Sequence, residues 1–133
     1  QQLVVIKRLS KDLNLGVEIV AHPTVRESDG LAMSSRNRYL SEEERNSALS
    51  LSRCLLAARA MVAEGEHRVS VLIAQAKEMI ETQPHTRVQY IQVVDEDTLT
   101  DIDKVTAKAV MAMAVFVGQA RLIDNMRLLP DSE

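Results

Sequence analysis

The spacing of apolar residues changes partway along the chain, and this change constrains the fold more than any other feature of the sequence. Between residues 41 and 83 apolar side chains recur every three or four positions, which is the spacing of one helical face. Beyond this segment they gather in β-rich runs at 88–94, 109–117 and 120–126. Helices followed by strands predict an α+β domain, in which the helices cover one face of a sheet.

Local signals predict where the two helices begin and end. Ser41 and Glu44 fit a capping box, in which each side chain accepts a backbone N–H bond at the start of a helix. Gly65 predicts the end of this first helix, because glycine adopts the left-handed conformation without strain. Ser70 is the predicted cap of a second helix, which ends before Pro84. The short link between them predicts a helical hairpin.

Only Gly118 and Gln119 separate the last two β-rich runs. A link this short joins neighbouring antiparallel strands. We therefore predict a three-stranded antiparallel sheet with the helical hairpin packed on it.

The beginning of the chain has a different pattern. Apolar residues at helical spacing predict a helix that ends near Gly16; they are Leu3, Ile6, Leu9 and Leu13. The β-branched run 17–21 predicts a strand covered by that helix, and a helix followed by a strand is one piece of an α/β layer. Because the chain opens inside a helical pattern with no capping residue, we expect it to be cut from a longer protein.

Composition excludes several classes of function. The 133 residues carry 16 basic and 19 acidic side chains spread along the chain, so no basic stripe is available for a nucleic-acid backbone. The longest apolar run, residues 109–117, is too short to span a bilayer. Cys54 is the only cysteine, and its helical apolar surroundings predict a buried, unreactive thiol. We expect a soluble, cytoplasmic protein that binds neither nucleic acid nor membrane.

Potential metal ligands are dispersed. The three histidines, His22, His67 and His85, lack metal-ligand spacing, and the acidic residues between 95 and 103 lack the spacing of a calcium loop. We predict no metal site and a solvated acidic connection.

A polar loop at residues 24–40 holds the densest group of side chains that could carry chemistry. Three arginines, three serines and Gly30 fall within residues 26–39. Guanidinium forks and hydroxyls suit a polyphosphate. The same composition also fits a solvated loop that caps the following helix, and both interpretations stay open. Because residues 28–37 contain few apolar anchors, we expect this segment to be mobile.

Within this loop, residues 29–37 read Asp-Gly-Leu-Ala-Met-Ser-Ser-Arg-Asn. This run resembles the phosphate-binding signature of pantothenate synthetases (pantoate:β-alanine ligases), their version of the mobile Lys-Met-Ser-Lys-Ser loop of adenylate-forming Rossmann nucleotidyltransferases. Residues 1–6 are similar to the segment after the Gly-Glu-Lys-Asp-Tyr motif of the family, and residues 120–125 resemble its near-terminal strand. The order and separation of these segments match the C-terminal part of such an enzyme.

The resemblance implies three regions. Residues 1–23 correspond to the last helix and strand of the Rossmann-like nucleotidyltransferase domain, residues 24–40 to a hinge and phosphate-binding loop, and residues 41–133 to a C-terminal lid domain.

The resemblance also implies roles for individual residues. Gln2 would bind pantoate, the backbone of Val25 would recognise the adenine edge, and Met33 would lie against the nucleotide. The triphosphate would be held, and its charge stabilised as pyrophosphate leaves, by Ser34, Ser35 and Arg36. Without the resemblance, Gln2 is a solvated residue at a helix start, Val25 a strand end and Met33 core filling. Because Ala32 and Ser35 stand where the broader loop has lysines, Arg36 is the one cation inside the motif.

The implied enzyme joins pantoate and β-alanine at the expense of ATP and Mg2+ through a pantoyl adenylate, giving pantothenate, AMP and pyrophosphate. We expect this portion to supply the phosphate loop and lid, and to be inactive alone, because the His-x-Gly-His and Gly-Glu-Lys-Asp residues of the family are not in it. Its expected partners are the N-terminal Rossmann domain, which with the substrate would hold Mg2+, and a second copy in a full-length homodimer. A non-catalytic nucleotide-binding module and a structural dimerisation module remain alternatives.

Overall fold

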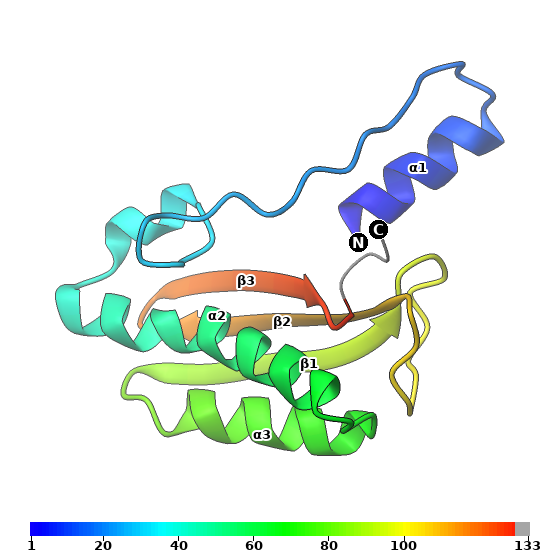
Figure 1. Ribbon diagram of the computed structural model, residues 1–133. Coiled ribbons are helices and arrows are strands. Elements are labelled where there is room, and N and C mark those ends of the chain that lie inside the picture. Colours follow the sequence, from blue (N-terminus) through cyan, green and yellow to red (C-terminus); the bar gives the residue numbers. More distant parts are fainter. Residues whose placement is uncertain (130–133) are drawn as a thin grey trace.

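The computed structural model describes residues 1–129, which form helices and one antiparallel sheet (Figure 1). The elements in chain order are α1 (Gln2–Asp12), the 3-10 helix η1 (Ser35–Tyr39), α2 (Glu42–Ala63), α3 (Val69–Glu81), β1 (Thr86–Asp95), β2 (Ala109–Val117) and β3 (Ala120–Arg127). The sheet is a meander of order β1-β2-β3, and α2 and α3 cover the same face of it. The predicted α+β fold, with a helical hairpin on a three-stranded antiparallel sheet, is confirmed. None of the described helices combines the length and apolar character needed to cross a membrane.

The start of α2 is the capping box that its sequence predicts. The Glu44 amide donates to Ser41 Oγ at 3.2 Å, and the Ser41 amide donates to Glu44 Oε2 at 2.9 Å. These two bonds satisfy amides that would otherwise have no partner inside the helix. After the helix, Gly65 adopts a φ of 103°, a left-handed conformation that suits glycine.

The start of α3 corrects one prediction, because Arg68 and not Ser70 is the N-cap and no side chain caps the helix. Backbone pairing fixes this end instead. The Val69 amide donates to the Asp103 carbonyl at 3.0 Å, and the Val105 amide donates to the His67 carbonyl at 2.9 Å. A distant segment of the chain therefore provides the bonds for which the sequence suggests a local serine.

The core lies between the helical hairpin and the inner face of the sheet. Alternate strand residues enter it, as Ala120, Leu122 and Asp124 do on β3. The largest fully buried side chains include Leu51, Leu55, Leu72, Ile80, Met111 and Met113. Cys54 lies among them with its sulfur 3.9 Å from that of Met113, and burial raises the pKa of its thiol to about 12. The predicted buried thiol is confirmed in its position, and its protonated form resists reaction.

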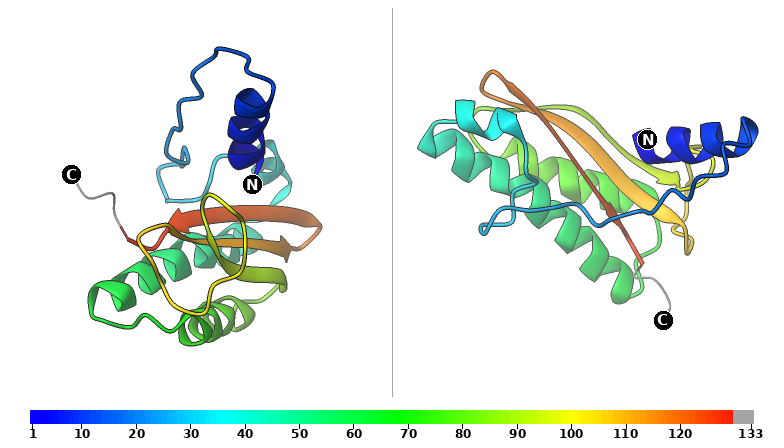
Figure 2. Two further views of the ribbon diagram at one scale, coloured as in Figure 1. Left: turned by 90° about the vertical axis from the view of Figure 1, so that its right-hand side faces the viewer. Right: turned by 90° about the horizontal axis from the view of Figure 1, so that it is seen from above.

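The N-terminal segment packs differently from the rest. The predicted helix is present as α1, but none of its residues is buried. The predicted strand at 17–21 is wrong for this chain, because the segment is extended without a strand partner among residues 1–129 and Val20 is 77% exposed. A strand needs a neighbour to bond its N–H and C=O groups. The chain instead runs from α1 to the polar loop as a connection along the outside of the molecule (Figures 1 and 2).

Candidate functional site

The polar loop begins as a small hairpin. The Met33 amide donates to the Val25 carbonyl at 2.9 Å, and the Glu27 amide donates to the Leu31 carbonyl at 2.8 Å. Gly30 occupies the turn with a φ of 95°, where a residue with a side chain would be strained. Leu31 is only 2% exposed and belongs to the core cluster. This segment therefore has one buried apolar anchor, Leu31, and a set of backbone bonds, and its mobility stays a prediction.

A charge pair attaches the hairpin to β3. Nη1 of Arg26 lies 2.7 Å from Oδ2 of Asp124, and Nη2 lies 2.9 Å from Oδ1. The same Nη1 donates to the Gly30 carbonyl at 3.1 Å. The Asp124 side chain is 2% exposed and that of Arg26 is 23% exposed, so water screens this pair weakly. The hydrogen bonds that Arg26 donates to Asp124 raise the pKa of the guanidinium. Arg26 is thus neutralised inside the protein, although composition alone groups it with the phosphate-binding arginines.

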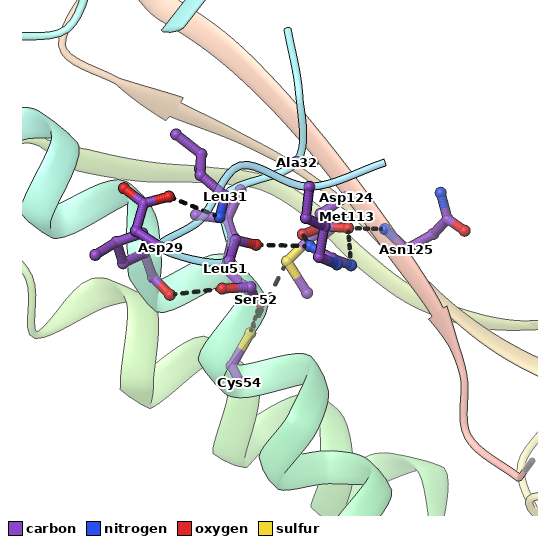
Figure 3. Close-up of polar contacts among 12 residues, drawn as sticks. Asp29, Leu31, Ala32, Leu51, Ser52, Cys54, Met113, Asp124 and Asn125 are labelled. Carbon is purple, nitrogen blue, oxygen red and sulfur yellow. Dashed lines mark hydrogen bonds and ion pairs between the residues drawn. The ribbon is translucent and has the colours of Figure 1, made fainter. Parts of the chain in front are cut away.

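A second set of ionic contacts attaches the hairpin to α2. Arg45, in the first turn of α2, donates through Nε to Asp29 at 2.8 Å and through Nη2 to Glu27 at 3.1 Å. The hydrogen bond from Arg45 is the main cause that lowers the pKa of Asp29. Asp29 also accepts from the Leu31 amide at 3.2 Å, which Figure 3 shows beside the buried leucine. The hairpin is therefore fixed to both the helical layer and the sheet.

Asn37 contributes a buried acceptor for which the sequence carries no local signal. Its Nδ2 donates to Oε1 of Glu27 at 2.9 Å and to the Ala32 carbonyl at 3.0 Å. These bonds fix the orientation of the amide, and the one to Glu27 is the main cause that lowers the pKa of that carboxyl. Oδ1 of Asn37 is buried and has no hydrogen-bond partner in the described part of the chain. A buried acceptor left unpaired is destabilising, which makes it notable beside a pocket.

The residues with predicted phosphate roles follow the hairpin. Ser34 is the N-cap of η1, and its Oγ accepts from the Arg36 amide at 3.2 Å. Met33 is 62% exposed, and Ser35 and Arg36 are exposed as well. The Arg36 guanidinium has no hydrogen bond or ion pair within residues 1–129, in contrast to Arg26. Within residues 1–129, the part of the loop after the hairpin therefore presents two hydroxyls that donate no hydrogen bond and one cation without a partner.

A pocket of about 150 Å3 lies between this loop and β3. Leu31 and Ala32 of the loop, Leu51 of α2 and Asp124 of β3 meet there, and Figure 3 labels all four. Three predicted residues line the pocket, namely Met33, Ser34 and Arg36. The other lining residues are Leu31, Ala32, Asn37, Leu51, Arg121, Leu122, Ile123 and Asp124.

The remaining predicted residues lie outside this pocket. Ser35 is next to it in the chain, and the Val25 carbonyl is engaged by the Met33 amide at the edge of the hairpin. Gln2 lies on α1, at the opposite end of the molecule from η1 (Figure 1 and the right-hand view of Figure 2). This chain thus gathers the predicted phosphate residues and leaves the predicted pantoate residue apart from them.

A larger hollow of about 740 Å3 lies between α1 and the turn at 96–98, and none of the predicted site residues lines it. In that turn, Oδ1 of Asp95 accepts from the amides of Asp97 and Thr98, both at 3.0 Å, and the bond from Thr98 is the main cause that lowers its pKa. Residues 1–129 bring together no group of three His, Cys, Asp or Glu side chains that could hold a metal ion.

The fold and the site define the class of protein, an α+β domain with a polar loop clamped onto the edge strand and first helix of its core. The family model for pantoate-beta-alanine ligase matches residues 1–127. The chain therefore belongs to the pantoate–β-alanine ligase family.

Relatives agree with this assignment. A pantothenate synthetase from Caldicellulosiruptor bescii is 56% identical over 126 residues, which are 95% of this chain and 45% of the relative. One from Syntrophobacter fumaroxidans is 50% identical over 130 residues, 98% of this chain and 46% of the relative. The chain thus spans a little less than half the length of these relatives.

Solved structures of the same family have this fold. The crystal structure of pantothenate synthetase from Thermus thermophilus matches with a TM-score of 0.90 and 41% identity, over 97% of this chain and 46% of that one. A pantoate-beta-alanine ligase from Francisella tularensis, complexed with beta-gamma ATP and beta-alanine, matches in fold with a TM-score of 0.59 and 24% identity over 96% of this chain and 40% of that one.

Proposed function

We propose that this chain is the C-terminal portion of a pantothenate synthetase and supplies the ATP phosphate loop and lid. The whole enzyme joins pantoate and β-alanine, using ATP and forming AMP and pyrophosphate. Its two steps follow from carboxylate chemistry. A carboxylate is a poor acyl donor, so the pantoate carboxylate first attacks the α-phosphorus of ATP and expels pyrophosphate; the amine of β-alanine then displaces AMP from the pantoyl adenylate.

One observation carries the proposal most strongly, the meeting of Met33, Ser34 and Arg36 at one pocket beside β3. The leaving pyrophosphate gains negative charge during adenylation, and the main demand on the protein is to stabilise that charge with positioned donors. The Ser34 and Ser35 hydroxyls would donate to phosphate oxygens, and the free guanidinium of Arg36 would form a forked pair with them. Met33 would cover the nucleotide, and the backbone of Val25 would bind the adenine edge.

The chain would contribute side chains to the triphosphate, whereas residues 1–129 hold no group of three His, Cys, Asp or Glu side chains for its metal ion. Mg2+ binds phosphate oxygens and keeps several waters, so it needs few protein ligands. We assign its retention to the substrate and to the N-terminal half of the enzyme. Gln2 would meet pantoate once α1 is joined to that half, since α1 buries none of its own residues here.

The ionic contacts bear on which parts of the three regions would move together. Residues 1–23 would complete the Rossmann-like domain, residues 24–40 would supply the hinge and phosphate loop, and residues 41–133 would form the lid. Because Arg26 is tied to Asp124 and Arg45 is tied to Asp29, residues 26–40 would move as one body with the lid. The hinge would then lie before Arg26, in the extended connection that follows α1.

The remaining parts of the proposal concern the whole enzyme. Its partners are the substrates, the N-terminal Rossmann domain and a second copy in a homodimer, and it works as a soluble cytoplasmic enzyme. The chain alone would be inactive, because the donors that bind β-alanine and complete the ATP site belong to the other half.

Two measurements on this chain test the proposal. In a coupled assay of AMP release from ATP, pantoate and β-alanine, the chain alone should match a control without protein, and adding the N-terminal half should produce turnover. ATP titrated into the chain should shift the NMR signals of residues 33–36 at millimolar concentration, and Arg36→Gln should weaken this response more than Arg38→Gln. A chain that ignores ATP would instead support a structural dimerisation module, and turnover by the chain alone would contradict the two-part active site.

A further inference from the structure

A second arginine, Arg121, reaches the pocket beside β3 from the outer face of the sheet. Along β3, Ala120, Leu122 and Asp124 are buried under the helices, so the residues between them point to the opposite face. Arg121 is one of these and lies opposite Phe116 of β2 in the strand register. It lines the same pocket as Ser34 and Arg36, although it is 85 positions away from Arg36 in the chain.

Gln89, at an irregularity in β1, binds the side chain of this arginine. The pairing of β1 with β2 shifts between Val88 and Tyr90, so Gln89 has no partner in the register. Bulges of this kind redirect a side chain from the regular pleat. Oε1 of Gln89 accepts from Nε of Arg121 at 2.8 Å. The guanidinium is thus fixed at one nitrogen by a neutral group.

Arg121 differs in this respect from the other arginines that contact the loop. Arg26 and Arg45 are bound to carboxylates, which cancel their charge inside the protein. Gln89 restrains Arg121 without neutralising it, and Nη1 and Nη2 of Arg121 have no hydrogen-bond partner within residues 1–129. A planar fork of donors with an uncancelled charge is the group that binds phosphate oxygens in two-point contacts.

The pocket is therefore electropositive. Its one carboxylate, that of Asp124, is paired with Arg26 by two hydrogen bonds, while the charges of Arg36 and Arg121 stay uncompensated by the described residues. Two like charges at one small cavity repel each other, and a polyanion bound between them would remove that repulsion. We propose that Arg121 is a second phosphate-binding cation, which together with Arg36 binds the β- and γ-phosphates of ATP from the side of the sheet. This inference rests on the proposed function and adds a residue outside the loop motif.

Binding of inorganic pyrophosphate to the chain, followed by calorimetry at fixed salt, tests this role. Arg121→Gln removes the charge and the fork, and Arg121→Lys keeps the charge. The matched control is Arg87→Gln, which removes a positive charge from β1 where the arginine stacks on Phe116 at 4.2 Å and does not line the pocket. We expect Arg121→Gln to weaken binding about tenfold, as for loss of a charged hydrogen-bond donor. Arg121→Lys should recover part of this, and Arg87→Gln should change binding by less than about twofold because water screens its charge.

Separate measurements test whether Gln89 positions Arg121 and whether a change at Arg121 affects folding. Gln89→Leu keeps both arginines and frees the guanidinium of Arg121, so it should weaken binding by a smaller factor than Arg121→Gln. The thermal midpoints of Arg121→Lys and the parent chain should agree, since the arginine makes one hydrogen bond to an exposed residue.

The outcomes separate this inference from the proposed function. If Arg36→Gln weakens pyrophosphate binding and Arg121→Gln does not, Arg121 has no phosphate role and the proposed function stands. Equal losses in Arg121→Gln and Arg87→Gln would reduce the effect to the general charge of the sheet face and would overturn the inference. No binding by the parent chain, or binding unaffected by both Arg36→Gln and Arg121→Gln, would remove the phosphate assignment of the pocket altogether.

Discussion

Asp124 links the polar loop to β3 through one buried side chain. Its carboxylate receives two bonds from Arg26, at the start of the polar loop, and one from the Asn125 amide at 2.7 Å. A buried carboxylate is tolerable only when its charge and lone pairs are satisfied. The ion pair therefore fixes the polar loop relative to β3. In this way an edge strand can determine where a candidate binding segment lies.

We expect Asp124→Asn to destabilise the chain by about 3 kcal/mol, because it leaves the weakly screened Arg26 cation without its counter-charge. Urea unfolding at neutral pH measures this. Glu81→Gln is the control, since its pair with Lys77 on α3 is 3.8 Å long and half exposed, and its loss should change stability by less than about 0.5 kcal/mol. Equal effects of the two changes would mean that the Arg26 pair is no stronger than a surface ion pair.

The carboxylates of Glu27 and Asp29 make the hairpin sensitive to acid. Their pKa values in the folded chain are lowered from the ordinary 4.5 and 3.8, chiefly by bonds from Asn37 and Arg45 respectively. A lowered pKa stabilises the folded form above the ordinary value, and this contribution is lost as the pH falls through the folded value. The hairpin should therefore loosen as the pH falls below the ordinary values of 4.5 and 3.8, before the core does.

Amide exchange measures this loosening. The protection factor of the Leu31 amide, which donates to Asp29, should fall in this range while that of Met113 in β2 stays high. Arg45→Gln should reduce the pH dependence at Leu31. Parallel loss of protection at both amides would instead indicate global acid unfolding.

Among the larger elements, the turn between β2 and β3 is locked against the start of α2. Gly118 has a φ of 56°, and a Cβ atom added there would overlap the Glu44 carboxylate. That carboxylate cannot simply move away, because it accepts the Ser41 amide in the capping box. The Gly118 amide also donates to the His85 carbonyl at 2.9 Å, which draws the start of β1 to the same place.

Gly118→Ala should therefore destabilise the chain by about 2 kcal/mol, of which about 1 kcal/mol comes from the left-handed backbone and the rest from the displaced cap. A double-mutant cycle with Glu44→Ala separates the two contributions. In the Glu44→Ala background, the glycine change should cost only the backbone part. Additive effects would show that the turn and the cap are independent.

The elements differ in how well the sequence predicts them, and the reason is the range of the interactions that form them. The capping box of α2 uses residues three positions apart, so the sequence predicts it. The start of α3 depends on residues 103–105, and a strand at 17–21 needs partners that residues 1–129 do not supply. The spacing of residues along the chain therefore predicts neither the true start of α3 nor the absence of a strand at 17–21.

The candidate site shows the same limit. Met33, Ser34 and Arg36 can be identified from the sequence because they lie within four consecutive positions of a segment that resembles a family motif. Arg26 and Asp124 are 98 positions apart, so their pairing has no local signal. One usable signal exists for Arg121: the alternation along 120–126 places it on the face opposite Leu122, and a charged residue on the open face of a predicted sheet is a candidate for binding.

At the scale of the whole molecule, the proposed function requires a rigid lid that would carry the phosphate loop and close over the active site. The chain supports such a lid because the loop is fixed to α2 and β3 and the connection before it is extended and unpaired within residues 1–129. In this proposed arrangement Arg36 would meet the triphosphate only when the lid closes. Its guanidinium, free of protein partners in the described residues, would be neutralised by the nucleotide alone.

Variants of Arg36 in the full-length enzyme test this arrangement. Arg36→Ala should reduce the rate of adenylate formation about a hundredfold, or about 3 kcal/mol of transition-state stabilisation, as when one charged donor is removed from a developing anion. Arg36→Lys should recover only part, because it keeps the charge and loses the planar fork. Isotope exchange between pyrophosphate and ATP measures this step, with Arg38→Ala as the control.

The second half-reaction decides between a phosphate role and a structural one for the same residue. When pantoyl adenylate is supplied, the β- and γ-phosphates are absent, so β-alanine should react at nearly the parental rate in Arg36→Ala. A lid that failed to close would instead exclude water poorly and slow both half-reactions. Equal damage to both steps would therefore assign Arg36 to lid closure or folding, and selective damage to the first would assign it to the leaving pyrophosphate.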